Sequence, residues 1–430
     1  MDEIPGLAAR RAALTMLDAV LRRGETLAHA AGAANALGTA ADRALARAIT
    51  AETLRWLVDL DALIDGATPR PLPDDAKSRM VLRMMLAQTL RLDIPVHAVI
   101  ATALPLLAGG PRRLAHAVFS TVINRTAPSP GADRERAALL PAFPTLPPVV
   151  AARWGERADA IARALAQPPP LDLTLRDPAE TGVWAERLGG RSLCAGHVRV
   201  ARGRAVEMLP GFGEGAWWAQ DLAASLPARL IGAPPGGGRE GAGALDLCAA
   251  PGGKTLQLAA AGWQVTALDL SDRRLALLRD NLARTGLAAT LVCADALAFE
   301  PDRLYDAILL DAPCTATGTC RRHPDVIHRI GARQIAEMAA LQARLLARAV
   351  RWLAPGGRLV YAVCSLERAE GEAQPPPAGL LPDPVTAADL GGAPVAGAIT
   401  ADGALRTDPG MLDRAGGLDG FYIARWRAPA

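Results

Sequence analysis

The chain has 430 residues, a length that favours two or three domains over one. Half of the residues are hydrophobic, but no apolar run reaches the roughly 18–20 residues needed to span a bilayer. The start of the chain, MDEIPGLAARR, lacks the apolar stretch of a signal peptide, so we expect a cytoplasmic protein without membrane association. The six cysteines contain no C-x-x-C pair, so neither a disulfide framework nor a bound metal is expected.

The formal net charge of +3 is too small to indicate nucleic-acid binding by itself. Only Lys77 and Lys254 are lysines, so arginine, the better phosphate and base-stacking cation, carries nearly all the positive charge. A GC-rich genome explains the same bias, so charge alone does not choose a partner.

Residues 1–130 are predicted to form an all-helical bundle, because apolar residues recur at helical spacing without strand-like alternation. The expected helical segments are 13–21, 44–64, 77–90, 96–107 and a run that opens at Pro111. Arg112 and Arg113 in this last run are candidate phosphate contacts, although a solvated helix surface explains them more simply. Residues 127–132, which contain Pro and Gly, are typical of a linker.

Residues 140–235 are predicted to form a small mixed α/β subdomain followed by a linker. Proline clusters bracket one helical run, Val149–Leu165, and short extended segments follow at Leu171–Arg176 and His197–Val200.

Residues 236–430 are predicted to form a Rossmann-like, doubly wound α/β domain. Short apolar runs at 244–248, 265–270, 290–293, 307–310 and 358–363 alternate with helical segments, as in βαβ units of a parallel sheet. Ligands of such sheets bind beyond the carboxyl ends of the strands, so functional residues are expected there. The Pro-, Ala- and Gly-rich segment 372–407 is expected to be a loose surface excursion.

The first strand leads into Asp246-Leu-Cys-Ala-Ala-Pro-Gly-Gly-Lys-Thr255, which lacks the glycine spacing of phosphate-binding and dinucleotide-binding loops. Its tight glycine turn lets a small ligand approach the backbone and a helix N-terminus. Asp269 ends the second strand, 23 residues after Asp246, where a carboxylate can accept hydrogen bonds from ribose hydroxyls. Asp295 follows the third strand, where it can meet an adenine amino group. This succession predicts a nucleoside-bearing cofactor without a pyrophosphate.

Two neighbouring strands end in cysteines, in Asp311-Ala-Pro-Cys314 and in Tyr361-Ala-Val-Cys364. Cys194 and Cys293 are expected to be buried as small hydrophobic residues. A thiolate at a strand end becomes a nucleophile when nearby positive charge lowers its pKa. Residues 321–323 (Arg-Arg-His) can supply that charge, although they can equally bind phosphate.

Two thiols and a carboxylate beside a methyl donor suit methylation of cytosine at C5. This carbon is a poor nucleophile until a thiolate adds to C6 and turns the ring into an enamine. A base must afterwards remove the C5 proton so that the thiol can leave.

The segments LDLCAAPGGKT, DAPCTATGTCRRHPD and YAVCSLERAEGE resemble the three signature motifs of the RNA cytosine-C5 methyltransferase family. Gln220-Asp221 and Asp419-Gly-Phe-Tyr422 are further matches, and the resemblance covers about residues 140–430. The helical N-terminus resembles a NusB-like RNA-binding domain. The resemblance implies an RNA (cytosine-5-)-methyltransferase of EC class 2.1.1 that uses S-adenosyl-L-methionine and acts on RNA, small-subunit ribosomal RNA above all. We expect a monomer.

By resemblance, the cofactor loop comprises Cys248, Ala249, Ala250, Pro251, Gly252, Gly253 and Lys254, with Asp269 at the ribose and Asp295 at the adenine end. Asp311 is implied to lie near both the methyl donor and the target base. Cys364 is implied to be the nucleophile, and Cys314 to assist release of the methylated product. DNA cytosine methyltransferases carry the nucleophile in their Pro-Cys motif, so Cys314 is the rival for that role.

The chain departs from the family pattern at Val363, where Thr is usual, and at Arg176-Asp177-Pro178, where Arg-Val-Asn is usual. Three other functions fit parts of the sequence: methylation of another RNA such as tRNA, methylation of a protein or small molecule, and RNA binding by the bundle with a vestigial sheet. The intact glycine loop, aspartates and cysteines argue against a vestigial sheet. The paired cysteines and the helical domain argue against a protein or small-molecule substrate.

Overall fold

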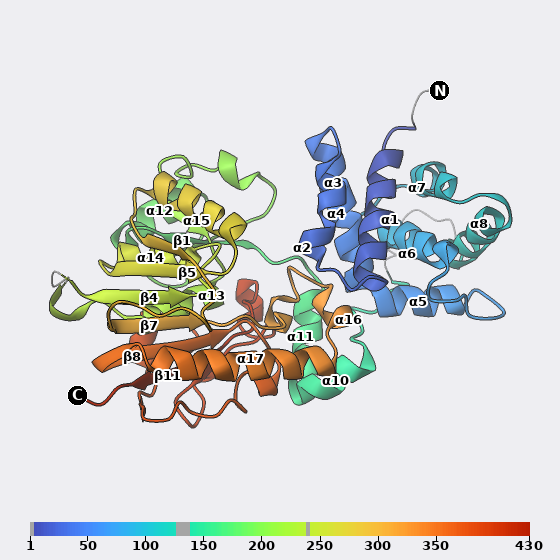
Figure 1. Cartoon of the computed structure of the whole chain (residues 1–430). Coiled ribbons are helices and arrows are strands. Elements are labelled where there is room, and N and C mark those ends of the chain that lie inside the picture. Colours follow the sequence, from blue (N-terminus) through green and yellow to red (C-terminus); the bar gives the residue numbers. More distant parts are fainter. Residues whose placement is uncertain (1–3, 126–137, 238–240) are drawn as a thin grey trace. The chain divides into compact units, whose positions relative to one another are not determined.

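The computed structural model describes residues 4–125, 138–237 and 241–430 (Figure 1), and the expected linker at 127–132 lies outside these ranges. The chain forms two compact units. The helical unit comprises Met1–Pro168 together with Cys320–Ile330, and the sheet unit comprises Pro169–Thr319 together with Gly331–Ala430. No helix in the described ranges is long and apolar enough to cross a membrane.

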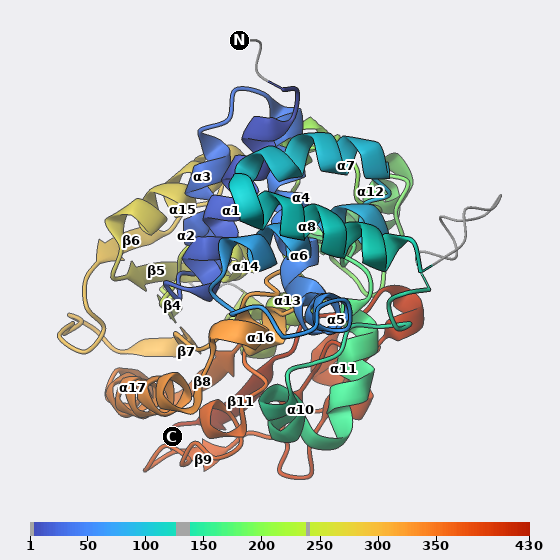
Figure 2. The same cartoon turned by 90° about the vertical axis from the view of Figure 1, so that its right-hand side faces the viewer.

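The helical unit is a bundle around α6, which is buried from Ser78 to Leu90 and packs against α1, α4, α5, α7 and α8 (Figure 2). A helix that is buried all round forms the centre of a bundle rather than its surface. The helices of this unit are α1 (Leu7–Leu21), α2 (Leu27–Ala30), α3 (Gly32–Asn35), α4 (Ala40–Arg55), α5 (Leu57–Asp65), α6 (Lys77–Arg91), α7 (Val96–Ala103), α8 (Gly109–Ile123), α10 (Pro148–Trp154), α11 (Ala158–Leu165) and α16 (Val326–Arg329). The predicted all-helical N-terminal region is confirmed.

Two expected helical runs are each divided in two. The run 44–64 breaks at Trp56, between α4 and α5. The run 149–165 breaks at Gly155, whose φ of 56° lies in the left-handed region that glycine adopts readily.

Helices α10 and α11 belong to the helical unit, although the sequence places residues 140–168 with the following subdomain. Thr145 donates from its amide and its hydroxyl to the Asp59 carboxylate, at 2.9 and 2.6 Å. Arg55 donates to the carbonyl of Leu165 at 3.0 Å. These contacts join the segment to α4 and α5.

The sheet unit begins with a three-stranded antiparallel sheet in the order β2-β1-β3, accompanied by α12 (Thr181–Arg187). Its strands are β1 (Leu171–Leu175), β2 (His197–Val200) and β3 (Trp217–Ala219). The expected small mixed α/β subdomain is therefore present between residues 171 and 219.

The main sheet has the order β10-β11-β8-β7-β4-β5-β6, and β9 pairs with β11. Its strands are β4 (Gly243–Leu247), β5 (Gln264–Asp269), β6 (Thr290–Cys293), β7 (Tyr305–Asp311), β8 (Leu353–Val363), β9 (Leu381–Pro382), β10 (Leu405–Arg406) and β11 (Tyr422–Arg427). Strands β4 to β8 pair in parallel, whereas β11 runs antiparallel to β8. The predicted Rossmann-like domain is confirmed, with an antiparallel edge added.

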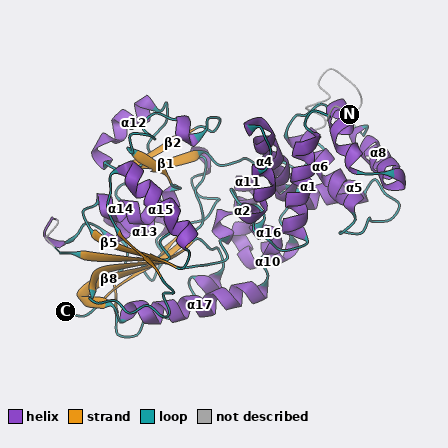
Figure 3. Ribbon diagram, turned by 45° about the horizontal axis from the view of Figure 1, so that its top comes forward, coloured by secondary structure: helices purple, strands orange, loops and turns teal. Residues whose placement is uncertain are grey.

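Helices cover both faces of this sheet (Figure 3). The helix α17 (Ala332–Val350) packs on one face, and α13 (Leu222–Ile231), α14 (Gly253–Ala260) and α15 (Asp272–Thr285) lie on the other. Coverage on both faces explains why β7 reads as an almost continuous apolar run.

The expectation that segment 372–407 is a loose surface excursion is wrong. Its residues Val385, Leu390, Val395 and Ala398 are buried in one apolar cluster with residues of α13 and β8. The composition conceals this packing because the segment forms short 3-10 turns and two-residue strands, which have no long hydrophobic period.

Candidate active site

The glycine turn after β4 is shaped by close packing against α15. Gly252 caps α14 with a φ of 108°, and a Cβ there would lie 2.2 Å from Cδ1 of Leu278. The amide of Ala249 donates to the carbonyl of Leu268 at 3.0 Å, and that of Ala250 donates to the Asp269 carboxylate at 3.1 Å. The turn is therefore held against the carboxyl end of β5, at the edge where ligands of such sheets bind.

Asp246 lies fully buried in β4, just before this turn. One carboxylate oxygen accepts a hydrogen bond from the Thr255 hydroxyl at 2.5 Å, and the other has no partner among the described residues. Burial raises the pKa of Asp246 to about 7, against the opposing effect of the Thr255 hydrogen bond. Oδ1 of Asp246, at the end of β4 next to the glycine turn, is therefore an acceptor without a hydrogen bond in the described ranges.

Lys254 and Asp311 form an ion pair between the first turn of α14 and the end of β7, with Nζ and Oδ2 2.7 Å apart. Burial acts to lower the pKa of Lys254, but the Asp311 carboxylate outweighs it and holds that pKa above the ordinary value. The ammonium also lies 5.4 Å from the ring centroid of Phe421. The sequence indicates Phe421 only as part of the Asp419–Tyr422 match, because its approach to Lys254 depends on the pairing of β11 with β8.

Cys314 and Cys364 are brought together by the parallel pairing of β7 and β8, in which Asp311 stands opposite Ala362. Their sulfur atoms are 3.4 Å apart, and the amide of Gly318 donates to the Cys364 carbonyl at 3.0 Å. The hydrogen bond to Cys364, followed by burial, raises the pKa of Cys314 well above that of a free thiol. Cys314 therefore favours its protonated, neutral form.

Asp269 and Asp295 lie at successive strand ends but in different surroundings. Asp269 is buried, and it accepts from the amides of Ala250 and Ser271 at 3.1 and 3.0 Å. Asp295 is exposed, and it accepts from the amide of Leu297 at 2.8 Å. The structure thus uses Asp269 to order the glycine turn, whereas Asp295 closes a local turn after β6.

The other candidate residues are dispersed. Cys194 is buried as expected, but the same expectation is wrong for Cys293, which is exposed because it ends β6 at the edge of the sheet. Residues 321–323 belong to the helical unit, whereas both paired cysteines belong to the sheet unit. Arg112 and Arg113 are exposed on α8. Within the described ranges, no three His, Cys, Asp or Glu side chains are placed to hold a metal ion.

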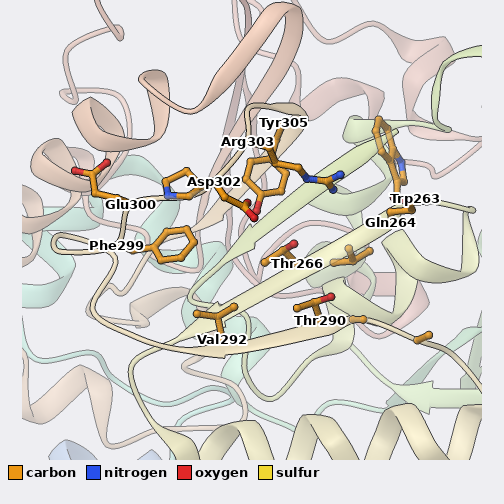
Figure 4. Close-up of a pocket in the computed structure, with 14 residues that line it drawn as sticks. Trp263, Gln264, Thr266, Thr290, Val292, Phe299, Glu300, Asp302, Arg303 and Tyr305 are labelled. Atoms are coloured by element: carbon orange, nitrogen blue, oxygen red, sulfur yellow. The ribbon is translucent and has the colours of Figure 1, made fainter. Parts of the chain in front are cut away.

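A large pocket, of about 860 Å³, lies elsewhere in the sheet unit (Figure 4). It is formed by residues at the start of β5, along β6 and just before β7, including Gln264, Thr290 and Asp302. None of the predicted site residues lines it. Because the glycine turn and the cysteines follow the opposite ends of their strands, this pocket is separate from the candidate active site.

Comparisons with known proteins agree with this geometry. Residues 238–425 match the family described as 16S rRNA methyltransferase RsmB/F, and residues 7–108 match the NusB family. The Ribosomal RNA small subunit methyltransferase B of Xanthomonas campestris pv. campestris is 34% identical over 390 residues, which cover 86% of this chain and 87% of that protein. Its namesake from Pseudomonas putida is 33% identical over 415 residues, which cover 89% and 90%. The crystal structure of PH0851 has a TM-score of 0.68 at 20% identity over 99% of both chains, which shows a common fold.

The resemblance read from the three motifs is thereby confirmed, and so is S-adenosylmethionine as the cofactor. The two matched regions also agree with the order of a helical N-terminal region before the parallel sheet. The chain belongs to the 16S rRNA methyltransferase RsmB/F family and is an S-adenosylmethionine-dependent RNA cytosine-C5 methyltransferase with a NusB-family N-terminal region.

Proposed function

We propose that this enzyme methylates C5 of a cytosine in 16S rRNA through a covalent bond between Cys364 and C6 of the base. The observation that carries the proposal is the 3.4 Å separation of the Cys314 and Cys364 sulfurs at the end of the sheet that also holds the Lys254–Asp311 pair. The rRNA substrate is supported by the two relatives named above, which cover most of this chain.

The residues around the glycine turn fit S-adenosylmethionine. Gly252 leaves no side chain where the turn packs against Leu278, and the free oxygen of Asp246 can accept from a ligand that carries donors. We assign residues 248–254 to the cofactor loop, Asp269 to the ribose, Asp295 to the adenine end and Asp311 to the edge that faces both cofactor and base. When bound there, S-adenosylmethionine supplies the methyl group.

In the proposed reaction, the Cys364 thiolate attacks C6, which leaves an enamine whose C5 is nucleophilic. Asp311 and Lys254 present a carboxylate and an ammonium at the same strand ends, so they can orient the base and stabilise charge that develops on its ring. A flipped or looped-out cytosine is required, because C5 and C6 are inaccessible within a base stack.

Cys314 is assigned to product release. Its pKa is raised first by the hydrogen bond to the Cys364 sulfur and then by burial, and the first and largest of these causes disappears once Cys364 becomes a neutral thioether on C6. Cys314 can then lose its proton to water and, as a thiolate, take the proton from C5. The electrons of the C5–H bond form the C5–C6 double bond, and Cys364 leaves as a thiolate.

Methyl transfer from labelled S-adenosylmethionine to unmodified 16S rRNA tests the proposal, with wild type, Cys364→Ala and Cys314→Ala compared and denaturing gels used to detect protein–RNA adducts. We expect Cys364→Ala to transfer nothing and form no adduct, and Cys314→Ala to accumulate one. The opposite behaviour of the two variants would identify Cys314 as the nucleophile.

Parallel reactions with unmodified 23S rRNA and a tRNA pool test the substrate. The 16S assignment requires that label enters 16S rRNA at least about tenfold faster than either alternative, which corresponds to about 1.4 kcal/mol of discrimination. Preferential labelling of tRNA would overturn the rRNA substrate and leave the cysteine roles in place.

A further inference from the structure

Glu370 is a fully buried carboxylate that lies six residues after Cys364. It ends a short 3-10 helix, Arg368–Glu370, and the Tyr361 hydroxyl donates to its backbone carbonyl at 2.6 Å. The side-chain partners that the structure gives it are neutral groups on Thr315, Ser365 and Gln342. Burying a carboxylate costs free energy unless its hydrogen bonds are complete. Solubility cannot explain a charged side chain at a fully buried position, so the role of Glu370 must lie in the contacts that it makes.

The Glu370 carboxylate joins the two cysteine loops. Its Oε2 accepts from the backbone amide of Thr315 at 2.9 Å, and its Oε1 accepts from the Thr315 hydroxyl and from the Ser365 hydroxyl, the latter at 2.7 Å. Thr315 directly follows Cys314, and Ser365 directly follows Cys364. One side chain therefore holds the residue after each cysteine.

Gln342 of α17 extends this network to the other side of Cys314. Its amide nitrogen donates to Oε2 of Glu370 and to the carbonyl of Pro313, both at 2.9 Å. Cys314 is thus fixed through the residues on either side of it. A further bond runs from the amide of Leu366 to the Thr317 hydroxyl at 2.9 Å, so the two loops are joined at a second point.

We propose that Glu370 is a positioning residue that sets the separation of the Cys314 and Cys364 sulfurs by holding Thr315 and Ser365 together. Within the part of the chain that the structure describes, it forms no hydrogen bond to either sulfur, and it positions them through the residues that follow the two cysteines. After the Cys364 hydrogen bond and burial, its charge also helps to raise the pKa of Cys314, so loss of that charge by itself would favour oxidation of the thiol, and only displacement of the loops would slow it. The proposal rests on the reaction assigned above, in which one thiol attacks C6 and the other serves the same base. Misplacement of a reacting group by about 1 Å can cost on the order of a hundredfold in rate.

The first test measures sulfur proximity without the methylation reaction. Diamide oxidises a close thiol pair to a disulfide by taking up two electrons and two protons, and the rate depends on how readily the sulfurs meet. Peptide mass spectrometry identifies the 314–364 pair among the six cysteines. We expect Glu370→Gln to slow formation of this disulfide several-fold. In the variant an NH2 group replaces one carboxylate oxygen, so it faces the N–H or O–H donors of Thr315 or Gln342, and the hydrogen bonds that hold the two loops are lost.

The second test is kinetic and uses the same full-length variants. Glu370→Gln should lower kcat by about tenfold or more while the KM values for RNA and S-adenosylmethionine stay within about twofold, since only reacting groups are displaced. Glu370→Asp, which keeps the carboxylate on a shorter stem, should lie between Glu370→Gln and wild type. Glu337→Gln removes an exposed carboxylate from α17 and should match wild type in both tests.

Unchanged disulfide formation and unchanged kcat in a folded Glu370→Gln protein would overturn the proposal. If that variant does not fold, Thr315→Val and Ser365→Ala remove single arms of the network, and wild-type values in both would overturn it equally. Slower disulfide formation in an enzyme whose wild type methylates none of the RNAs would instead support the positioning role and refute the proposed substrate.

Discussion

The carboxylate of Asp325 accepts a hydrogen bond from the backbone amide of Leu27, 298 residues earlier in the chain, at 3.1 Å. It also accepts from Nε of Arg329 at 2.8 Å. Nearby, Arg55 donates to the carbonyl of Arg321 at 3.0 Å. Residues 320–330 are therefore part of the helical unit, although they directly continue the loop that carries Cys314.

Replacement of Asp325 by Ala is predicted to destabilise the helical unit by about 2 kcal/mol, because the half-buried amide of Leu27 loses its acceptor and Arg329 loses its partner. Hydrogen exchange should show faster exchange of the Leu27 amide and of residues 320–330. Glu25→Gln, which removes a surface ion pair with Arg23, should leave these rates close to wild type. Equal protection in Asp325→Ala and wild type would contradict the prediction.

Asp246 is predicted to make the cofactor-free enzyme less stable as the pH rises from about 4 to about 7. Its pKa is about 7 in the folded protein against the ordinary 3.8, so between these values the folded state binds more protons than the unfolded state. The free energy of unfolding contributed by this group therefore falls with rising pH and levels off above about 7.

Asp246→Asn should abolish that slope, since an amide does not titrate. Urea unfolding of both proteins at a series of pH values measures the difference, and the variant should gain stability over wild type as the pH rises to about 7. A difference that is independent of pH would show that Asp246 is ionised across this range.

Gly252→Ala is predicted to weaken both folding and S-adenosylmethionine binding. The residue has a φ of 108°, and its new Cβ would lie 2.2 Å from Leu278, so strain and overpacking together should cost about 2–4 kcal/mol. Gly286→Ala is the matched control, because Gly286 also has a positive φ but has open space around its Cβ position. Thermal unfolding and calorimetric titration with the cofactor measure the two effects.

Only Gly252→Ala should lose cofactor affinity, whereas both variants should lose stability. Cofactor binding by Gly252→Ala with wild-type affinity would exclude the turn from the binding site.

Removal of Asp311 alone is predicted to leave the Lys254 ammonium buried without its partner. Asp311→Asn should lower the free energy of unfolding by about 2–3 kcal/mol, a value reduced for the partial exposure of Asp311. The double variant Lys254→Met with Asp311→Asn should regain most of this stability, because it buries no charge.

Measurements of methyl transfer should separate a role of the Lys254–Asp311 pair in stability from a role in the reaction. Both Asp311→Asn and the double variant are expected to be at least about a hundredfold slower than wild type, since both lose the carboxylate that we propose faces the reacting base. Recovery of activity along with stability in the double variant would show that the ion pair serves only the fold.

The sequence by itself determined the elements that position the site. The period of its apolar residues indicated the helical region and the five parallel strands, because secondary structure follows from local spacing. The same spacing placed the glycine turn, Asp311, Cys314 and Cys364 at strand ends. Parallel pairing then required these residues to meet at one edge of the sheet.

Only the tertiary structure decided which side chains touch. Three contacts join residues that are far apart in the chain. They are the 3.4 Å contact of the two sulfurs, the hydrogen bonds of Glu370 to Thr315 and Ser365, and the hydrogen bond from Leu27 to Asp325. Segment 372–407 likewise packs into the core although its composition is typical of a surface loop. Such contacts depend on the register and packing of whole elements, and no local pattern of residues encodes them.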